Sequence, residues 1–482
     1  MSRRFFPHIG ARGSSLWLST TYLADAESPL TITCGEQVTY VLPDGSKHFG
    51  FQLSSSAAIF DGSLKAIQIR GISKPLDITC TNTALSGVLD LSSIEIESLT
   101  LNPGQNISSI TWPENQTAPF VKFYGEDYTG EPRHLDFSAM PNLSGRFELL
   151  DNFLSFSHTG ANPGLVDYFS IQTPDGTKIT NTTLDLTAFS NLGGEFRLSR
   201  LDNIQTLVLA GNTNVFTHFS IGHNAPGKKM ALSGALDLHA LFPNITNTLK
   251  VFRTNLTSLS VPAGPYSSLD AHTNALTSIT WNGTTLSPGA YLYLYSNQLA
   301  NIDVGTLPYV AGMDLRIYGN GALVTGPAEL RSYSHFYIGT GNLTPEPALT
   351  NVVADDLRMH GMQVTGPVYA AGGNQGTTFY IGNHDVAVTH VPVIGVDIIY
   401  RNIYSRSAGY SQEKVNKEID DAYDNIIGAM TGTKVLYLGN QGVGLNNAAP
   451  SADRQTKIDA LVADGWIVTV WDGVSANITY AP

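Results

Sequence analysis

A short pattern of apolar and polar positions recurs along the second half of the chain. Pairs of apolar residues separated by one position follow one another at intervals of 20, 23, 23, 21, 21 and 22 residues. Apolar residues two positions apart point to one side of a β-strand, and strands that recur at such short intervals predict the stacked coils of a solenoid. The pairs are Leu249-x-Val251, Leu269-x-Ala271, Leu292-x-Leu294, Leu315-x-Ile317, Phe336-x-Ile338, Leu357-x-Met359 and Phe379-x-Ile381.

A polar turn position follows several of these pairs. Asn274, Asn297 and Asn320 each stand five residues after the first apolar residue of their pair. An asparagine side chain can bond the backbone groups that are left open where a strand ends. The L-x-L-x-x-N-x-L pattern resembles the leucine-rich-repeat family, whose repeats are about 20–29 residues long. The resemblance implies a mainly β fold, with a leucine-rich-repeat-like solenoid of parallel strands over residues 83–400.

Residues 1–82 lack the repeat and predict a small β domain. Leu30–Cys34, Gln37–Val41 and Ala66–Ile69 are typical of short strands, and Pro43–Gly45 is typical of a turn. A bare terminal repeat would expose core residues to water, so a solenoid needs a cap at each end. We expect this domain to cap the solenoid or to attach it to another body.

Residues 401–482 predict an α/β cap that continues the solenoid sheet. Two amphipathic helices alternate with two apolar strands, and the order strand, helix, strand indicates a parallel crossover. The second strand is expected to be the last one of the chain. The expected helix bounds are Ser411 and Gly432, then Ser451 and Gly465, and the expected strands are Val435–Asn440 and Trp466–Trp471.

Composition excludes several classes of protein. The chain has 482 residues, a net charge of −13 and no basic run, which argues against a nucleic-acid partner. It has no run of about 18 apolar residues, so we expect no membrane insertion. The first residues lack the apolar segment of a secretory signal, and Cys34 and Cys80 predict two buried thiols rather than a disulfide.

The sequence shows weak signals for catalysis. The glycines of Gly439–Gly444 have the wrong spacing for a dinucleotide site, and the paired acids Asp355–Asp356 and Asp420–Asp421 are expected on a solvated surface. His335 and His360 both adjoin repeat strands, but no third ligand is convincingly placed beside them. We therefore expect a non-enzymatic protein without catalytic residues, metal or cofactor.

The most informative surface is the outward face of the predicted strands. Residues that alternate with the core positions form two rows across successive strands, and these rows are rich in Tyr, Arg and His. Tyrosine and arginine are enriched at binding interfaces, but aromatic residues on a strand face also stabilise neighbouring strands. Both interpretations stay open. The candidate binding residues are Tyr293, Tyr295, Arg316, Tyr318, Tyr337, Arg358, His360 and Tyr380.

The C-terminal segment carries a second resemblance. Ala448–Ser451, Ile458–Leu461 and Asp464–Val470 are similar to the ends of bacteriophage virion and tail-fibre proteins, including those of phages that infect Bacteroidetes. The resemblance implies a structural virion protein for host attachment, located on the particle and released by lysis. Its partners would be other virion proteins or further copies of itself, and a host surface protein or glycan as receptor.

Two other functions remain open. The first is a bacterial leucine-rich-repeat adhesin or scaffold, which neighbouring secretion genes would favour. The second is a polysaccharide-degrading tail enzyme. Its acids could come from different repeats and leave no local motif, and it would require a pair of carboxylates about 5–9.5 Å apart in a groove.

Overall fold

The computed structural model describes most of the chain, and its residues group into two units, Met1–Leu256 and Thr257–Pro482. We call these the first and the second unit and describe each by itself. The boundaries expected at residues 82 and 400 stay a prediction. The described residues are 14–20, 30–41, 47–55, 65–72, 76–81, 86–91, 96–102, 106–112, 122–125, 133–136, 143–151, 153–157, 164–173, 180–320, 323–339, 351–360, 374–382, 398–428, 430–440 and 446–482.

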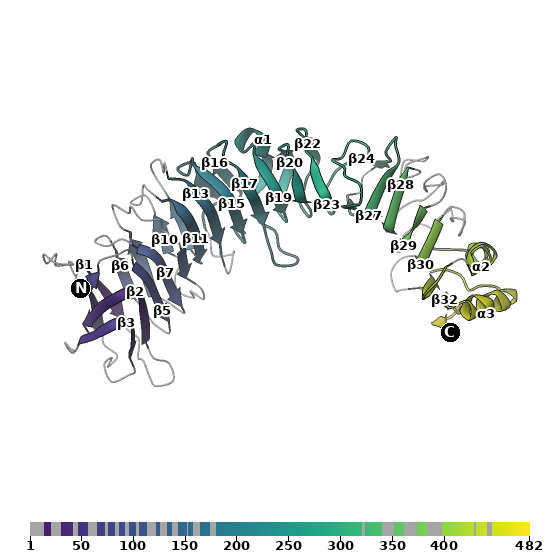
Figure 1. Ribbon diagram of the computed structural model, residues 1–482, viewed down its shortest axis with the longest axis horizontal. Helices are drawn as coiled ribbons and strands as arrows, with labels where there is room; N and C mark the ends of the chain where they lie inside the picture. Colours follow the sequence, from purple (N-terminus) through teal and green to yellow (C-terminus); the bar gives the residue numbers. More distant parts are fainter. Residues whose placement is uncertain are drawn as a thin grey trace. The chain divides into compact units, whose positions relative to one another are not determined.

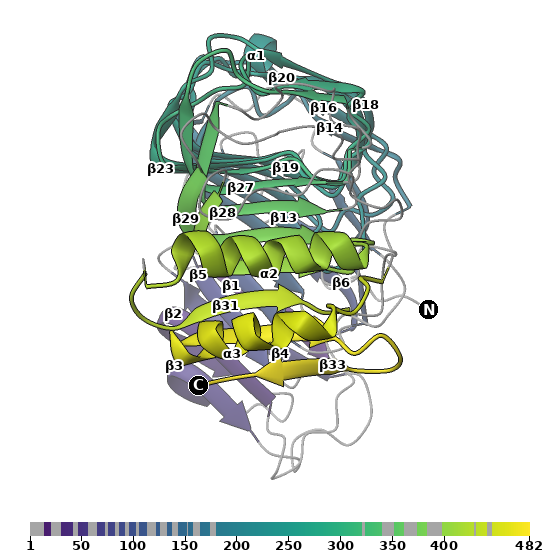
Figure 2. The same cartoon turned by 90° about the vertical axis from the view of Figure 1, so that its right-hand side faces the viewer.

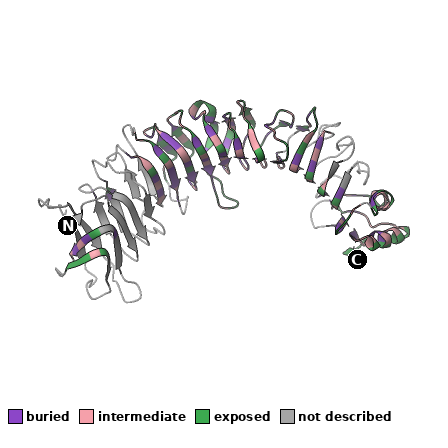
Figure 3. Ribbon diagram, viewed as in Figure 1, coloured by how far each residue is buried: buried purple, intermediate pink, exposed green. Residues whose placement is uncertain are grey.

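The fold is mainly β, and parallel strands form a β-solenoid of about nine turns with few helices (Figure 1). This confirms the predicted class and the parallel stacking. Between residues 76 and 339, strands of a main sheet alternate along the chain with strands of separate side sheets. Figure 3 shows buried and exposed positions alternating along the main-sheet strands, as expected when one face of a strand lines the core.

The first unit begins with antiparallel strands and continues with parallel ones. β2 pairs antiparallel with β3, β4 and β5, after which β5, β7, β9, β11, β13, β15, β17 and β19 form a parallel series. β6, β8, β10 and β12 form one parallel side sheet, and β14 with β16 another. The elements are β1 (Ser14–Thr20), β2 (Leu30–Val41), β3 (Lys47–Ser55), β4 (Lys65–Ile72), β5 (Leu76–Thr81), β6 (Ser86–Asp90), β7 (Ile96–Asn102), β8 (Asn106–Thr111), β9 (Lys122–Gly125), β10 (Arg133–Asp136), β11 (Gly145–Asp151), β12 (Phe153–Ser157), β13 (Val166–Gln172), β14 (Thr183–Leu186), β15 (Leu192–Ser199), β16 (Thr206–Leu209), β17 (Phe216–Gly222), β18 (Ser233–Asp237), α1 (Leu238–Leu241) and β19 (Ile245–Phe252).

The N-terminal strand prediction was wrong in one respect. Leu30–Cys34 and Gln37–Val41 belong to the single strand β2, whose pairing with β3 shifts register between Thr33 and Val38. This irregularity lets the strand continue through a sequence that looks interrupted. Ala66–Ile69 lies within β4, as predicted, and Cys34 is buried. The expected turn at residues 43–45 and the side chain of Cys80 lie outside the described residues.

A stack of phenylalanine rings fills the core of the first unit. Phe147, Phe169, Phe196 and Phe219 occupy the same register position in four successive main-sheet strands. Their ring centroids are 5.2, 5.4 and 4.8 Å apart, and all four side chains are buried. Aromatic stacking of this kind adds to the free energy of burial, so the ladder helps to hold successive coils in register.

The second unit continues the same architecture. β21, β23, β25, β27, β28, β29, β30, β31 and β32 form a parallel series, and β33 joins β32 antiparallel. β20 pairs with β22, and β24 with β26, in parallel side sheets. The strands are β20 (Asn255–Val261), which spans the boundary, β21 (Tyr266–Asp270), β22 (Ser278–Trp281), β23 (Leu286–Tyr293), β24 (Asn301–Asp303), β25 (Met313–Arg316), β26 (Leu323–Thr325), β27 (Arg331–Gly339), β28 (Val352–His360), β29 (Asn374–Gly382), β30 (Ile398–Arg406), β31 (Lys434–Leu438), β32 (Trp466–Trp471) and β33 (Asn477–Tyr480).

The apolar positions predicted from the repeat line the core of this unit. Each residue of the predicted pairs from Leu269 to Ile381 is buried, and the first residues of successive pairs are register partners. The predicted asparagine role is also confirmed. Asn297 Nδ2 donates to Leu294 O at 2.9 Å and to Ala271 O of the preceding coil at 2.8 Å. The Asn297 amide therefore closes a turn and ties two coils together.

Two helices follow β30 and β31, as predicted. α2 (Gln412–Ile426) begins after Ser411, whose Oγ accepts a hydrogen bond from the backbone N–H of Lys414 at 3.4 Å. α3 (Gln455–Ala463) contacts α2 and β32, and Figure 2 shows both helices beside β31. The parallel pairing of β30, β31 and β32 confirms the expected strand–helix–strand crossovers.

Three details of this segment differ from the prediction. α2 ends at Ile426 rather than near Gly432, because Gly428 adopts a left-handed φ of 72° and its N–H donates to Asp464 at 3.0 Å. Ser451 precedes a 3₁₀ turn (Ala452–Arg454) and makes no side-chain cap. β32 is not the last strand, because β33 follows it and pairs with it. β33 is mostly exposed, so its sequence lacks the apolar–polar alternation that predicts a half-buried strand.

Candidate functional site

The pairing register of the second unit aligns aromatic and charged residues across successive strands. Asp270, Tyr293, Arg316, Tyr337, Arg358 and Tyr380 are register partners on β21, β23, β25, β27, β28 and β29. They alternate with core residues along each strand, so their side chains share the face opposite the core. We call this surface the strand face.

A second row lies two positions earlier on the same strands. Tyr291, Asp314, His335 and Asp356 are register partners on β23, β25, β27 and β28. From the sequence, His335 was considered only as a metal ligand, and Asp356 was expected on a solvated surface. That assignment was wrong, because the Asp356 side chain is only 13% exposed and pairs with Arg358. The signal was the Asp-x-Arg pattern, which places both side chains on one face of a strand.

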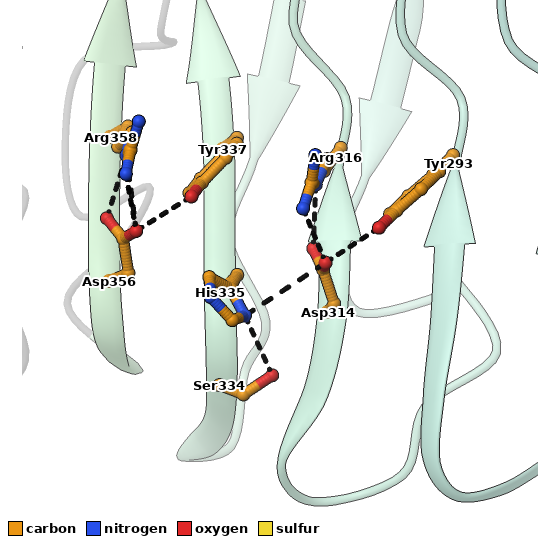
Figure 4. Close-up of polar contacts among 8 residues, drawn as sticks. All are labelled: Tyr293, Asp314, Arg316, Ser334, His335, Tyr337, Asp356 and Arg358. Carbon is orange, nitrogen blue, oxygen red and sulfur yellow. Dashed lines mark hydrogen bonds and ion pairs between the residues drawn. The ribbon is translucent and has the colours of Figure 1, made fainter.

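Two equivalent clusters of tyrosine, aspartate and arginine result (Figure 4). In the first cluster, Arg316 donates from Nε and Nη2 to the two Asp314 carboxylate oxygens at 3.1 and 2.8 Å. Tyr293 of the preceding coil donates its hydroxyl hydrogen to Asp314 Oδ2 at 2.8 Å. Bidentate pairing with a carboxylate fixes the plane of the guanidinium group.

The second cluster repeats this geometry. Arg358 donates from Nε to Asp356 Oδ1 at 2.9 Å and from Nη2 to Asp356 Oδ2 at 2.8 Å. Tyr337 of the preceding coil donates to Asp356 Oδ2 at 2.7 Å. The same three residue types therefore recur with the same donors and acceptors two strands further along the solenoid.

Cation–π contacts join the two clusters. The Arg316 guanidinium carbon lies 4.6 Å from the Tyr293 ring centroid and 4.8 Å from that of Tyr337. The Arg358 guanidinium carbon lies 4.6 Å from the Tyr337 ring centroid. Such contacts add to the ion pairs in stabilising the arrangement. The guanidinium groups cover the faces of the tyrosine rings. The edges of the tyrosine and arginine side chains therefore remain for contact with a ligand.

Burial changes the acidity of the two tyrosines. Burial and, after it, the hydrogen bond to Asp356 together raise the pKa of Tyr337 to about 12. Burial likewise raises the pKa of Tyr293, and the hydrogen bond to Asp314 has the same effect. Both phenols therefore stay protonated at neutral pH and remain hydrogen-bond donors.

His335 lies between the two aspartates in the register. Its Nδ1 is 3.2 Å from Ser334 Oγ and 4.0 Å from Asp314 Oδ2, and its side chain is 43% exposed. Its ring stands edge-on to Tyr337, at a centroid distance of 5.9 Å and an interplanar angle of 84°. Its side chain is more exposed than those of Asp314 and Asp356, its neighbours in this row.

The remaining predicted residues divide into stacked and buried ones. Tyr295 and Tyr318 stack with centroids 4.6 Å apart, and Tyr295 also stacks on His272. Tyr380 was expected to face outward but is only 8% exposed. The guanidinium carbon of Arg406, a residue not selected from the sequence, lies 5.8 Å from the Tyr380 ring centroid.

Two buried residues begin the outward rows. The same alternation places Asp270 and His272 beside Tyr293 and Tyr295, but both are buried and contact each other through the Asp270 carboxylate and His272 Nδ1. The His360 backbone pairs with Gly339 and Gly382, and its side chain lies outside the described residues. A contact between the side chains of His335 and His360 therefore lies outside the described residues.

The first unit presents related residues in another order. Arg146 pairs with Glu148 and Arg197 with Glu195, each at 2.7 Å, and both arginines contact the Tyr168 ring. Both arginines are exposed, and among the described residues no tyrosine hydroxyl donates to either glutamate. They provide matched controls for experiments on the strand face.

The two aspartates are well separated, and each is occupied by an arginine. Asp314 and Asp356 lie two strands apart, or about 9.6 Å at the usual strand spacing. Both oxygens of each carboxylate already accept hydrogen bonds from arginine, an arrangement that suits an ionised group rather than a proton donor. Among the described residues, no group of three or more His, Cys, Asp or Glu side chains could hold a metal ion.

The described helices include none that is both long and apolar enough to cross a lipid bilayer. Comparisons of the chain with protein-family models, with curated proteins and with solved structures found no match.

Proposed function

We propose that the protein is a non-enzymatic surface or tail protein of a bacteriophage particle, and that its strand face recognises a receptor on the host. The observation that carries the binding part of this proposal is the repeated tyrosine–aspartate–arginine cluster of Tyr293, Asp314 and Arg316 and its equivalent two strands away. The virion setting derives from the resemblance of the C-terminal sequence.

The preorganisation of the clusters supports a binding role. Each guanidinium plane is set by a bidentate carboxylate and by aromatic rings before any ligand arrives. A group that is already ordered loses less conformational entropy on binding, so its contacts contribute more to affinity. The same contacts also stabilise neighbouring strands, and the two roles are compatible.

The rest of the chain fits a recognition protein with capped ends. We propose that the solenoid is leucine-rich-repeat-like, that residues 1–82 attach it to the particle, and that residues 401–482 seal its other end. A bacterial adhesin or intracellular scaffold would share these features. Detection of the protein by mass spectrometry in purified phage particles supports the virion proposal, whereas its absence from particles favours the adhesin or scaffold.

Adsorption to host cells tests the strand face. The double variant Asp356→Ser and Arg358→Ser removes both members of one ion pair, so that neither charge is left unpaired. We expect at least about a tenfold loss of adsorption, which corresponds to 1.4 kcal/mol of binding free energy. The matched control is Glu195→Ser with Arg197→Ser in the first unit. Unchanged adsorption of a folded Asp356/Arg358 variant would remove the strand face from the proposal.

Incubation with host capsule tests the non-enzymatic part. If the protein only binds, the length of the polysaccharide stays unchanged, as measured by size-exclusion chromatography. Shortening of the polymer that is lost in Asp314→Asn or Asp356→Asn would instead identify a polysaccharide-degrading enzyme.

A further inference from the structure

The cations of the two clusters are more exposed than their carboxylates. The Arg316 side chain is 29% exposed and that of Asp314 is 15%, while Arg358 is 40% exposed and Asp356 is 13%. The arginine is therefore the more accessible member of each ion pair. Although the chain as a whole is acidic, with a net charge of −13, this part of its surface presents positive groups.

Each arginine also keeps one edge for a ligand. A guanidinium group has five N–H donors, and the aspartate occupies the edge formed by Nε and Nη2. Within the described part of the chain, Nη1 of Arg316 and Nη1 of Arg358 have no hydrogen-bond partner. The edge formed by Nη1 and Nη2 can bind a carboxylate or sulfate through two parallel hydrogen bonds.

The spacing of these two edges selects the ligand. Arg316 and Arg358 are separated by Tyr337 in the register, so they lie two strands apart, or about 9.6 Å. In an extended peptide, side chains on one face recur about every 6.8 Å, and the phosphates of one strand of duplex DNA recur about every 3.4 Å along the helix axis. The length of two linked hexoses is closer to the two-strand spacing than the side-chain repeat of a peptide or the phosphate repeat of DNA.

We propose that the strand face binds a linear glycan that carries one anionic group on every second sugar. Two successive anionic groups bind the outer edges of Arg316 and Arg358, and the exposed edges of Tyr337 and His335 between them contact the intervening sugar. This inference rests on the proposed function, because it names the ligand class of the same face. It adds that recognition depends on the spacing of charge along the glycan.

Calorimetry on the full chain tests the charge spacing. The probes are hyaluronan di- and tetrasaccharides, which carry one and two carboxylates on alternate sugars, a tetrasaccharide with sulfates in those positions, and the neutral chitin tetrasaccharide. We expect an anionic tetrasaccharide to bind at least about tenfold more tightly than the disaccharide, because the second contact is intramolecular. The sulfated and carboxylated probes distinguish the two sources of anionic groups.

Lysine variants test the two contacts separately. Arg316→Lys and Arg358→Lys keep the charge next to the aspartate but lose the bidentate outer edge. We expect each to reduce tetrasaccharide affinity to that of the disaccharide, while Arg197→Lys in the first unit leaves it unchanged. Melting curves confirm that the variants are folded.

The results separate this inference from the proposed function. Equal binding of neutral and anionic tetrasaccharides, equal binding of di- and tetrasaccharides, or no binding of any probe would overturn the glycan inference. If adsorption to host cells still depends on Asp356 and Arg358, the recognition proposal stands in each of those cases. If adsorption is also unaffected, both fail.

Discussion

At the scale of single residues, asparagine amides connect successive coils of the second unit. Asn320 Nδ2 donates to Ile317 O at 2.8 Å and to Leu294 O of the preceding coil at 3.0 Å, which repeats the pattern of Asn297. The sequence predicted that these amides serve the turn of their own coil. The bond to the preceding coil depends on stacking, so only the structure shows it.

Replacement of Asn297 by alanine tests this connection. The change removes one of the two amide donors to each of the carbonyl oxygens of Ala271 and Leu294, and it removes the side-chain oxygen that accepts from the Leu276 N–H. We expect the free energy of unfolding to fall by about 1–3 kcal/mol, as measured by denaturant titration. Gln298→Ala is the control, because the exposed neighbour should change stability by less than about 0.5 kcal/mol. Equal effects of the two variants would contradict the proposed role of the amide.

Glu418 on α2 is a second residue with a measurable role. Its side chain is buried, and both carboxylate oxygens accept hydrogen bonds from Ser405 Oγ, at 2.9 and 3.0 Å. Burial raises the pKa of Glu418 from its ordinary 4.5 to about 7. Between these two values the folded protein binds more protons than the unfolded chain, so stability should fall as pH rises through this range.

The variant Glu418→Gln should lose this pH dependence. Wild-type protein is expected to lose free energy of unfolding between about pH 4.5 and pH 7, by up to about 3 kcal/mol from this group. Denaturant titrations at several pH values measure the slope. Glu413→Gln, an exposed position on the same helix, should keep the wild-type slope. A wild-type slope in Glu418→Gln would show that another group titrates.

At the scale of elements, Asp464 joins the end of α2 to β31. Asp464 Oδ2 accepts hydrogen bonds from the Gly428 N–H at 3.0 Å and from Lys434 Nζ at 2.6 Å. The Gly428 bond and then the Lys434 bond lower the pKa of Asp464. The amphipathic pattern predicted both helices, but the helix end depends on this contact between segments far apart in sequence. The pattern therefore placed the end of α2 too late.

Removal of the Asp464 charge tests how firmly these elements are held. Asp464→Asn leaves the buried ammonium group of Lys434 without its carboxylate. We expect the free energy of unfolding to fall by about 2 kcal/mol or more, because an unpaired buried charge is poorly solvated. Thermal denaturation followed by circular dichroism measures the loss. Asp459→Asn, at an exposed position of α3, serves as control, and a similar loss there would argue against a specific ion pair.

At the scale of the whole molecule, the solenoid makes stability a sum of contacts between neighbouring coils. Within the second unit, Leu292, Leu315 and Phe336 are register partners in the buried row on β23, β25 and β27. A core residue of one coil thus contacts the coils on either side. Damage to one coil should affect its neighbours more than distant coils.

The variant Leu315→Ala tests this local stability. It removes a buried side chain, so we expect a loss of about 2–5 kcal/mol. In hydrogen-exchange mass spectrometry, β23, β25 and β27 should lose protection, whereas β31 and β32 in the same unit should keep most of theirs. Uniform loss throughout the second unit would show that the unit unfolds as one cooperative body.

The sequence alone determined the solenoid class, the buried rows and the turn asparagines of the second unit. These features depend on local periodicity, because alternation along a strand decides which side chains face the core. The tertiary structure decided which side chains meet across coils. Asp314 contacts Tyr293 only because backbone pairing sets the register between segments 20 to 23 residues apart. The same pairing brought Asp356 to Tyr337 and left Tyr380 buried, and no local pattern specifies either result.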